Sequence, residues 1–224
     1  MSCNLTWLQT VRNKGLEPRK EDVSAVFDHV ERLSGMSHST ALESKDVIER
    51  LLGGRVDASK IGAMGHSYGS ATCVRFVQDD KRCKAVVALD PWLWPMSENC
   101  EEGVQTPLLI ISSEFWDSAV NNAARRHKLV KNSHGSSYSV VVKDTKHHNF
   151  DDLPLLLGLP SIGTKLGFIG GQDPLVGFEA INELTRLFFK ATLLDAYSTT
   201  EEALLHAVEH SPHVHMEVAS EKGG

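Results

Sequence analysis

Short apolar runs alternate with longer segments of helical periodicity along most of the chain. The apolar runs are rich in β-branched or aliphatic residues, and they predict strands at 60–65, 84–90, 106–111 and 138–143. Apolar positions that repeat with the helical period predict helices at 21–34, 44–52, 70–79, 117–131 and 177–194. Strands that are apolar on both faces and separated by helices are typical of a parallel sheet covered on both sides. The pattern therefore predicts an α/β fold.

Composition changes once, after about residue 198. Before that point the chain has no internal repeat and no linker-like tract, so residues 1–198 are predicted to form one domain. Beyond it histidine and glutamate accumulate, and residues 199–224 are predicted to be a tail that frays. The histidines of this tail do not have the spacing of a zinc-protease motif, so we expect no metal site there. They are His206, His210, His213 and His215.

Charge and composition exclude several classes of protein. The net charge is −6, which indicates no basic surface for nucleic acid. Four cysteines in 224 residues are too few and too scattered for a disulfide scaffold. The most apolar stretch, 153–164, is interrupted by Pro154 and Pro160 and falls short of the roughly 18 residues of a transmembrane segment. No signal sequence is evident at the N-terminus, which slightly favours a cytoplasmic location.

A candidate nucleophile lies between the first predicted strand and the helix after it. Gly65-His66-Ser67-Tyr68-Gly69 matches G-x-S-x-G in the strand-turn-helix context of a nucleophile elbow. Such a turn raises the serine hydroxyl above the sheet and turns the backbone N–H of Tyr68 towards a developing oxyanion. We expect side chains at positions 65 and 69 to clash in so sharp a turn, so that both need glycine. Ser67 is the predicted nucleophile, and a glycine-rich turn without chemistry is the alternative.

A base and an acid must accompany the serine, in the chain order Ser, Asp/Glu, His. Asp90 ends the second predicted strand, and Glu114 ends the third. His147 and His148 follow the fourth. All four residues are placed at the carboxyl ends of strands. Position alone separates neither Asp90 from Glu114 nor His147 from His148.

Four segments of the chain resemble the platelet-activating factor acetylhydrolases, the group VII phospholipases A2. The segments are DASKIGAMGHSYGSATCVRF, CKAVVALDPWLWPM, PLLIISSEFW and HHNFDDLP. Members of that family carry GHSFGGAT, ALDAWMFPL, a segment like FFINSE and an H-x-N-F motif. The resemblance covers residues 55–195 and implies an α/β-hydrolase fold. Tyr68, Ser70 and Pro91 stand where the family has Phe, Gly and Ala, and none of these changes removes a catalytic group.

The resemblance also implies roles and an activity. The nucleophile falls on Ser67, the acid on Asp90 and the base on His147. The implied reaction is calcium-independent hydrolysis of the short sn-2 acetyl ester of platelet-activating factor and related phospholipids. It proceeds through an acyl-enzyme, without a cofactor, on phospholipid presented at a membrane or lipoprotein surface. A general carboxylesterase and a catalytically silent interaction module are the alternatives.

Two further expectations concern the surroundings of this site. The leucine-rich run 153–159 is predicted to be a buried helix or loop behind His147, with contact to lipid as the alternative. The second oxyanion donor of an α/β-hydrolase comes from a loop after an early strand, upstream of the serine. Only 66 residues precede Ser67, and the sole His-Gly pair, His134-Gly135, follows it. By the resemblance, the N-terminal strands and that loop are expected to be missing, so the chain corresponds to a C-terminal portion of the family domain.

Overall fold

The computed structural model describes residues 10–96, 99–116, 122–156, 160–194, 196–197 and 199–220. Its strands are β1 (Gly62–His66), β2 (Ala85–Leu89), β3 (Leu108–Ser113), β4 (Ser137–Val142) and β5 (Val214–Ser220). Its α-helices are α2 (Leu16–Ser34), α3 (His38–Glu43), α4 (Val47–Leu52), α5 (Tyr68–Asp79), α7 (Asn122–Asn132), α8 (Leu153–Leu156), α9 (Pro160–Lys165), α10 (Pro174–Leu193) and α11 (Thr200–Glu209). A short 3-10 helix, η4 (His147–Phe150), follows β4.

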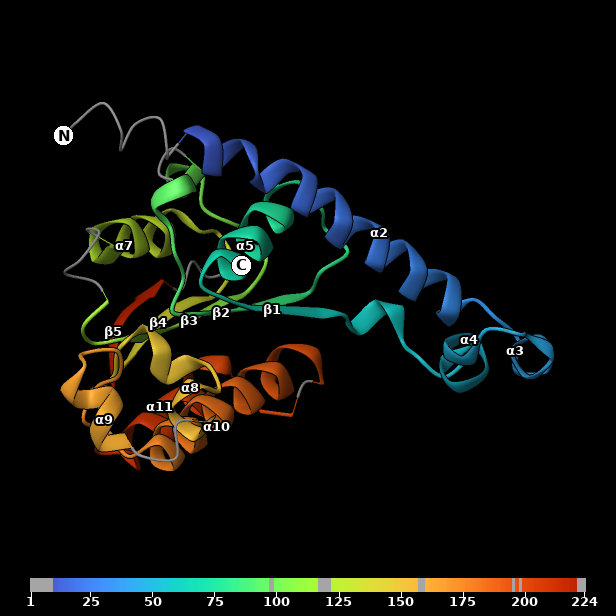
Figure 1. Ribbon diagram of the computed structural model, residues 1–224. Coiled ribbons are helices and arrows are strands. Elements are labelled where there is room, and N and C mark those ends of the chain that lie inside the picture. Colours follow the sequence, from blue (N-terminus) through green and yellow to red (C-terminus); the bar gives the residue numbers. More distant parts are fainter. Residues whose placement is uncertain are drawn as a thin grey trace.

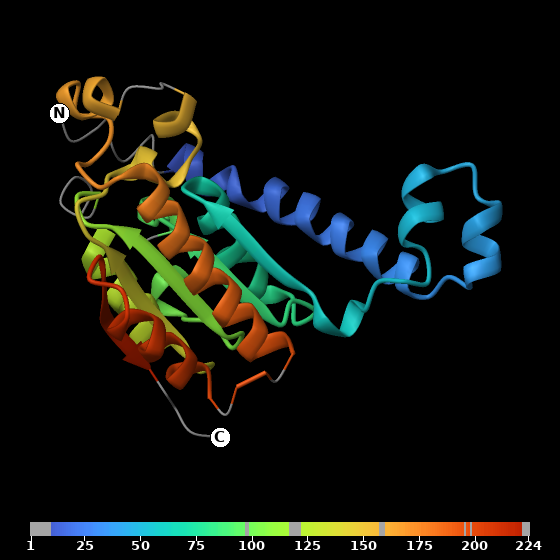
Figure 2. The ribbon, with the colours of Figure 1, turned by 90° about the horizontal axis from the view of Figure 1, so that it is seen from below.

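One five-stranded sheet organises the molecule, in the order β1-β2-β3-β4-β5. The first four strands pair in parallel, and β5 pairs antiparallel with β4. Helices α2, α5 and α7 cover one face of the sheet, and α10 and α11 cover the other (Figures 1 and 2). The predicted α/β fold is therefore confirmed.

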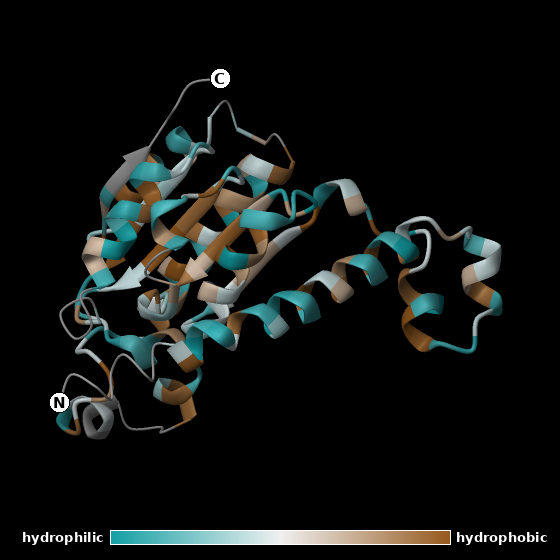
Figure 3. Cartoon of the chain, turned by 90° about the horizontal axis from the view of Figure 1, so that it is seen from above, coloured by the Kyte–Doolittle hydropathy of each residue, from teal (hydrophilic) through white to brown (hydrophobic). Residues whose placement is uncertain are grey.

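Alternate residues of the central strands enter two separate cores. Val86 and Ala88 of β2 point towards Phe76 of α5, whereas Ala85 and Val87 belong to the core under α10. Figure 3 shows the apolar strands enclosed between helices whose outer surfaces are more polar. Burial on both faces explains why these strands read as continuous apolar runs in the sequence. It also holds the carboxyl ends of the strands, where the candidate residues lie, in fixed register.

The last turns of α2, together with α3 and α4, form an arm that extends beyond the sheet (Figure 1). The sequence predicted α2 and α4 but not α3, which is only six residues long. Ser37 caps α3 by accepting a hydrogen bond from the Thr40 N–H, and Asp46 caps α4 through the Ile48 and Glu49 N–H groups. The expected helix at 44–52 corresponds to α4, and α3 is an additional helix before it.

Strand β1 lies at the edge of the described sheet, with β2 as its neighbour. Met64 in the middle of this strand is 55% exposed. Ile61 just before it is partly buried and packs against the α5 core. An edge strand keeps one row of backbone N–H and C=O groups outside the ladder.

The expectation that the chain frays after residue 198 is wrong for residues 199–217. Helix α11 packs against α10, and β5 extends the sheet beside β4. Ala203 and Leu204 of α11 and Val214 of β5 are buried in the core under α10. The high proportion of histidine and glutamate obscured this apolar stripe, because those residues occupy its solvent side.

The segment after η4 also differs from its prediction. Residues 153–156 form the short helix α8, but Leu155 and Leu156 are exposed, the latter to 79%. Residues 157–159 of the predicted run lie outside the described residues. Only Pro154 of this helix is buried. Within the part of the chain that the structure describes, no helix has the length and apolarity needed to cross a membrane.

Candidate active site

The carboxyl ends of three parallel strands carry the predicted residues to one edge of the sheet. Ser67 directly follows β1, Asp90 directly follows β2, and His147 opens η4 after β4. Ser67 and Asp90 both have positive φ, of 58° and 38°. Such backbone is strained for residues other than glycine, and strain of this kind is common where a functional side chain must be presented.

Backbone contacts hold the turn around Ser67. The Ser67 N–H donates to the Leu89 carbonyl at 2.9 Å, and the Trp92 N–H donates to the Ser67 carbonyl at 3.1 Å. The Ser70 hydroxyl contacts the Gly65 and Leu89 carbonyls at 2.5 and 2.9 Å. These bonds join the first turn of α5 to the ends of β1 and β2.

The two glycines of the turn have different roles, and the expectation that both avoid a clash is wrong for one of them. A Cβ at Gly65 would lie 2.5 Å from the backbone carbon of Gly69, a distance that Cβ atoms do not tolerate. A Cβ at Gly69 would meet no atom within 4 Å. Gly65 is therefore required because the backbone of Gly69 passes directly over it, whereas position 69 has room for a side chain.

Tyr68 is the first residue of α5. The first N–H groups of a helix have no partner within the helix and carry the positive end of its dipole. The Tyr68 N–H is thus placed, directly after Ser67, where an oxyanion donor is expected. Its hydroxyl donates a hydrogen bond to the Arg12 carbonyl, which lies just before α2.

A continuous set of hydrogen bonds links the three candidate residues. His147 Nε2 lies 2.9 Å from the Ser67 Oγ, and His147 Nδ1 lies 2.6 Å from the Asp90 Oδ2. A carboxylate oxygen only accepts, so Nδ1 carries the proton and Nε2 is left to accept from the serine hydroxyl. Asp90 is fully buried and also accepts from the Ser113 N–H at 2.7 Å and from its hydroxyl at 3.0 Å. These donors fix the carboxylate towards His147.

The two rival residues lie outside this set of hydrogen bonds. Glu114 Oε2 accepts from the Asp144 N–H at 2.7 Å and so links the ends of β3 and β4. His148 Nδ1 is 2.7 Å from Asp151 Oδ2. Spacing left both pairs open. The structure separates them by the direction in which each side chain points.

Aromatic rings hold the imidazole of His147 from two sides. The Trp116 ring stacks on it with centroids 4.0 Å apart, and the His66 ring lies 4.6 Å away. Burial, and secondly the neighbouring His147, lower the pKa of His66, which favours its neutral form. The sequence analysis missed the contributions of Trp116, His66 and Ser113. Their one signal was their position at the ends of predicted strands.

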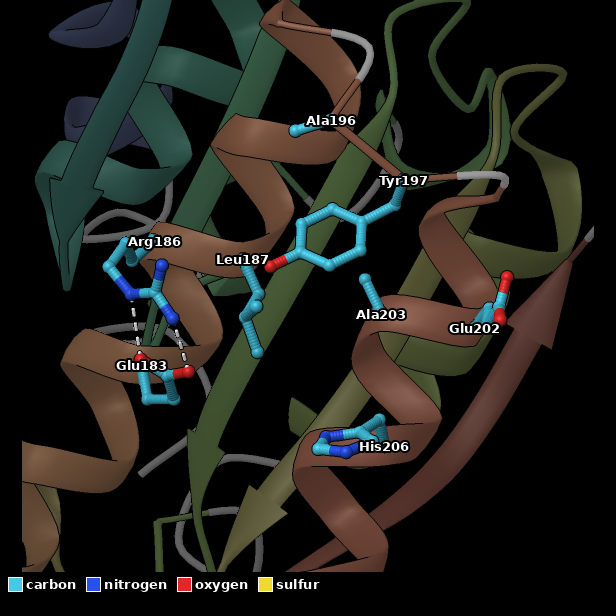
Figure 4. A pocket seen from close by; sticks show the side chains of 8 residues that line it. All are labelled: Glu183, Arg186, Leu187, Ala196, Tyr197, Glu202, Ala203 and His206. Atoms are coloured by element: carbon cyan, nitrogen blue, oxygen red, sulfur yellow. Dashed lines mark hydrogen bonds and ion pairs between the residues drawn. The ribbon is translucent and has the colours of Figure 1, made fainter.

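Two cavities differ in their relation to this site. One of about 360 Å³ lies beside His147 and has Phe115, Trp116 and Phe168 in its wall. A larger one, of about 550 Å³, lies between α10 and α11 and holds Tyr197 and His206 (Figure 4). In the larger one Arg186 already pairs with Glu183. None of the predicted catalytic residues lines it.

Other reactive groups do not compete with Ser67. Burial raises the pKa of the Cys73 and Cys83 thiols to about 11 and that of Cys100 to about 12, which disfavours a thiolate nucleophile. Among the described residues, no group of three or more His, Cys, Asp or Glu side chains could hold a metal ion.

Comparisons with known proteins bear on this geometry. A family model described as "Platelet-activating factor acetylhydrolase, isoform II" matches residues 6–204. The chain is 32% identical over 142 residues to a platelet-activating factor acetylhydrolase of Cavia porcellus, covering 63% of this chain and 32% of that one. It is 26% identical over 184 residues to the protein of the same name from Gallus gallus, covering 82% and 43%. The chain thus spans about a third to two fifths of the length of these relatives.

A solved structure gives the fold independently. The ferulic acid esterase from Streptomyces cinnamoneus aligns with a TM-score of 0.70 at 22% identity. The alignment covers 92% of this chain and 56% of that protein. At this identity the likeness establishes that the two chains share an α/β fold.

Proposed function

This chain belongs to the platelet-activating factor acetylhydrolase, isoform II, family, and on that premise we propose that it is a serine esterase. Its substrate is the short sn-2 acyl ester of platelet-activating factor and related phospholipids. The observation that carries the proposal is the bonded set Ser67–His147–Asp90, with distances of 2.9 and 2.6 Å. No calcium or other cofactor enters the proposed reaction.

In the first half-reaction His147 acts as the general base. Its Nε2 takes the proton of the Ser67 hydroxyl as Oγ attacks the ester carbonyl carbon. The carbonyl oxygen becomes an oxyanion, which the Tyr68 N–H at the start of α5 stabilises. His147 then returns the proton to the departing glycerol oxygen, and the acyl group stays on Ser67.

In the second half-reaction water replaces the serine hydroxyl as the nucleophile. His147 Nε2 accepts a proton from the water as the water oxygen attacks the acyl-enzyme carbonyl carbon. It then returns that proton to the Ser67 Oγ as the acyl–serine bond breaks, which releases the short carboxylic acid and restores the serine hydroxyl. Asp90 keeps the proton on Nδ1 throughout, so that Nε2 is free to exchange protons. Its burial and its two bonds from Ser113 support this orienting role.

Approach from a lipid surface is part of the proposal. Large exposed apolar side chains occur in the wall of the smaller cavity, in α8 directly after η4, and just after α9. They are Phe115, Leu155, Leu156, Leu166 and Phe168. Exposed apolar side chains that lie near a ligand cavity suit contact with lipid. These side chains would enter an aggregate of phospholipid while the ester reaches Ser67.

A fluorophosphonate probe tests the nucleophile. We expect covalent labelling of Ser67, located by peptide mass spectrometry, and no labelling after Ser67→Ala. Glu114→Gln serves as a control that leaves the nucleophile and the base in place. Labelling that persists in Ser67→Ala would refute the assignment.

A general carboxylesterase remains the second candidate, because the structural neighbour is a ferulic acid esterase. The two candidates differ in acyl-chain preference. A phospholipid acetylhydrolase should favour acetyl over long acyl chains at the sn-2 position, whereas a general esterase should hydrolyse both at similar rates. A folded protein that neither reacts with the probe nor hydrolyses any ester would instead indicate a silent interaction module.

A further inference from the structure

The cavity beside His147 has an apolar wall and a cationic edge. Phe115, Trp116 and Phe168 supply the apolar side, and Lys146 lines the same cavity. A ligand that fits such a space has an apolar body and an anionic group at one end. A ligand with both features is a narrower class than esters in general.

The Lys146 ammonium has unused hydrogen-bonding capacity. Its Nζ donates to the Gly167 carbonyl at 3.1 Å, and an ammonium has three donors. In the part of the chain that the structure describes, no carboxylate lies within 4.0 Å of it. Lys20 and Lys128, by contrast, pair with acidic side chains.

The acidic groups around this edge are bound to other donors. Glu114 accepts from the Asp144 N–H, and Asp144 in turn accepts from the Gly171 N–H. Asp151 accepts from the Leu153 N–H and pairs with His148. The charge of Lys146 is therefore left for a ligand in the cavity.

Lys146 is held next to the catalytic base. Its backbone N–H donates to the Asn149 Oδ1 at 2.9 Å, and the same oxygen accepts from the Gly170 N–H at 2.7 Å. This clamp fixes the start of η4, where His147 directly follows Lys146. In a glycerophospholipid only a few covalent bonds separate the sn-2 carbonyl carbon from the phosphorus atom. A phospholipid whose ester carbonyl lies at Ser67, which bonds His147, can therefore extend its phosphate into the cavity that His147 and Lys146 line.

From this arrangement we infer that Lys146 binds the phosphate of the substrate and selects phosphate-bearing esters over uncharged ones. The inference rests on the proposed function, because it names a substrate contact of that same site. The contact is an N–H···O–P hydrogen bond between opposite charges, which is stronger than a bond between neutral groups. Lys146 is thus a specificity-determining residue, outside the proton transfers at Ser67.

Binding of non-hydrolysable ether lipids provides the test. The ligands are a short-chain dialkyl glycerophosphocholine below its critical micelle concentration and the matching dialkylglycerol without phosphate below its solubility limit. Titration is followed by tryptophan fluorescence, since Trp116 lies in the cavity wall. We expect Lys146→Met to weaken binding of the phosphate-bearing lipid about tenfold relative to the phosphate-free lipid. Lys146→Arg should keep most of the difference.

Lys143→Met is the matched control. Lys143 follows β4, is exposed, and donates to the Pro212 carbonyl, so its loss changes the net charge equally outside the cavity. We expect it to preserve the preference for the phosphate-bearing lipid. Equal losses in Lys143→Met and Lys146→Met, or equal weakening of both lipids in Lys146→Met, would overturn the inference.

The test separates the inference from the proposed function, because ether lipids are not hydrolysed. Binding that depends on Lys146 in a protein without esterase activity would contradict the proposed function and leave the anion contact standing. Esterase activity with a phosphate preference unchanged in Lys146→Met would support the proposed function and contradict the role of Lys146.

Discussion

At the scale of single residues, the direction of a side chain matters more for its role than its position along the sequence. Asp90 and Glu114 both follow parallel strands, yet Asp90 bonds His147 and Glu114 bonds a backbone N–H. Similarly, Gly65 and Gly69 flank Ser67 symmetrically in sequence, yet only Gly65 lies under another segment of backbone. Each pair yields a prediction with an internal control.

The acid pair predicts unequal losses of activity. Asp90→Asn should reduce turnover by about 10⁴-fold, as in serine proteases, because an amide at this position favours the wrong imidazole tautomer. Glu114→Gln should change turnover only a few-fold, because this side chain touches neither Ser67 nor His147. Steady-state kinetics on a short-chain ester measures both. Reversed severities would transfer the role of the acid to Glu114.

The glycine pair predicts unequal losses of stability. Gly65→Ala forces its Cβ against the Gly69 backbone, so we expect a destabilisation of at least about 2 kcal/mol by the overpacking mechanism. Gly69→Ala places a methyl group in open space in the first turn of α5, where alanine is the better helix former by up to about 1 kcal/mol. Urea unfolding of both variants gives the comparison. A large loss in Gly69→Ala would show that the space above the turn is not open in solution.

At the scale of elements, a buried charge joins the C-terminal strand to the sheet. Arg126 of α7 is almost fully buried and forms an ion pair with Glu217 of β5. Glu217 also lies within 3.4 Å of the Ser139 hydroxyl and 3.3 Å of His127 Nε2. Glu217 is partly exposed, whereas Arg126 is shielded from water, so loss of the Glu217 carboxylate removes part of the compensation of a buried charge.

The prediction for this pair concerns both stability and pH. Glu217→Gln should lower the free energy of unfolding by about 1 kcal/mol at neutral pH, between the values for exposed and for buried pairs, while Glu209→Gln on the exposed face of α11 should leave it unchanged. Burial alone would raise the pKa of Glu217, but the Arg126 guanidinium beside it holds that pKa below its usual value. The contribution of Glu217 is therefore present above the unfolded-state pKa of about 4.3 and is lost as the pH falls through the lower folded-state value. Urea unfolding at neutral pH and below pH 4 should show the difference between wild type and Glu217→Gln shrinking on acidification; a constant difference would contradict it.

At the scale of the whole molecule, β1 is an edge strand of the sheet that the described residues form. Its outer edge and the half-exposed Met64 form a surface on which another strand could pair. We expect this chain on its own to self-associate at high concentration through that edge. Met64→Lys should reduce the association, with a change of less than about 0.5 kcal/mol in stability.

Light scattering and size-exclusion chromatography measure the association. Leu51→Lys on α4 adds the same charge to another exposed apolar position, at the end of the arm. It should leave association through β1 unchanged. Equal reductions in the two variants would show that apolar exposure in general, rather than the strand edge, drives association.

Most of the sheet could be predicted from the sequence because β2, β3 and β4 are buried on both faces. Their apolar runs therefore mark the strands within a few residues. The ends of these runs also indicated where chemistry-bearing side chains lie. The bonding of Asp90 and His147 was not predictable from spacing, because it depends on side-chain direction. Helix α11 and strand β5 were missed, since their buried positions are few and separated by histidine and glutamate.

The backbone bonds around Ser67 divide the candidate site into two mechanical halves. The nucleophile and the acid are joined through Leu89 and Trp92, so they form one rigid block on adjacent strands. The candidate base, His147, lies on a different segment, which the Asn149 amide bonds to Lys146 and Gly170 and which Phe150 anchors in the core. A substitution at Asn149 would move His147 away from Ser67 while Ser67 and Asp90 keep their positions. The molecule could then lose its chemistry without losing its fold, and a measurement of folding alone would not reveal the loss.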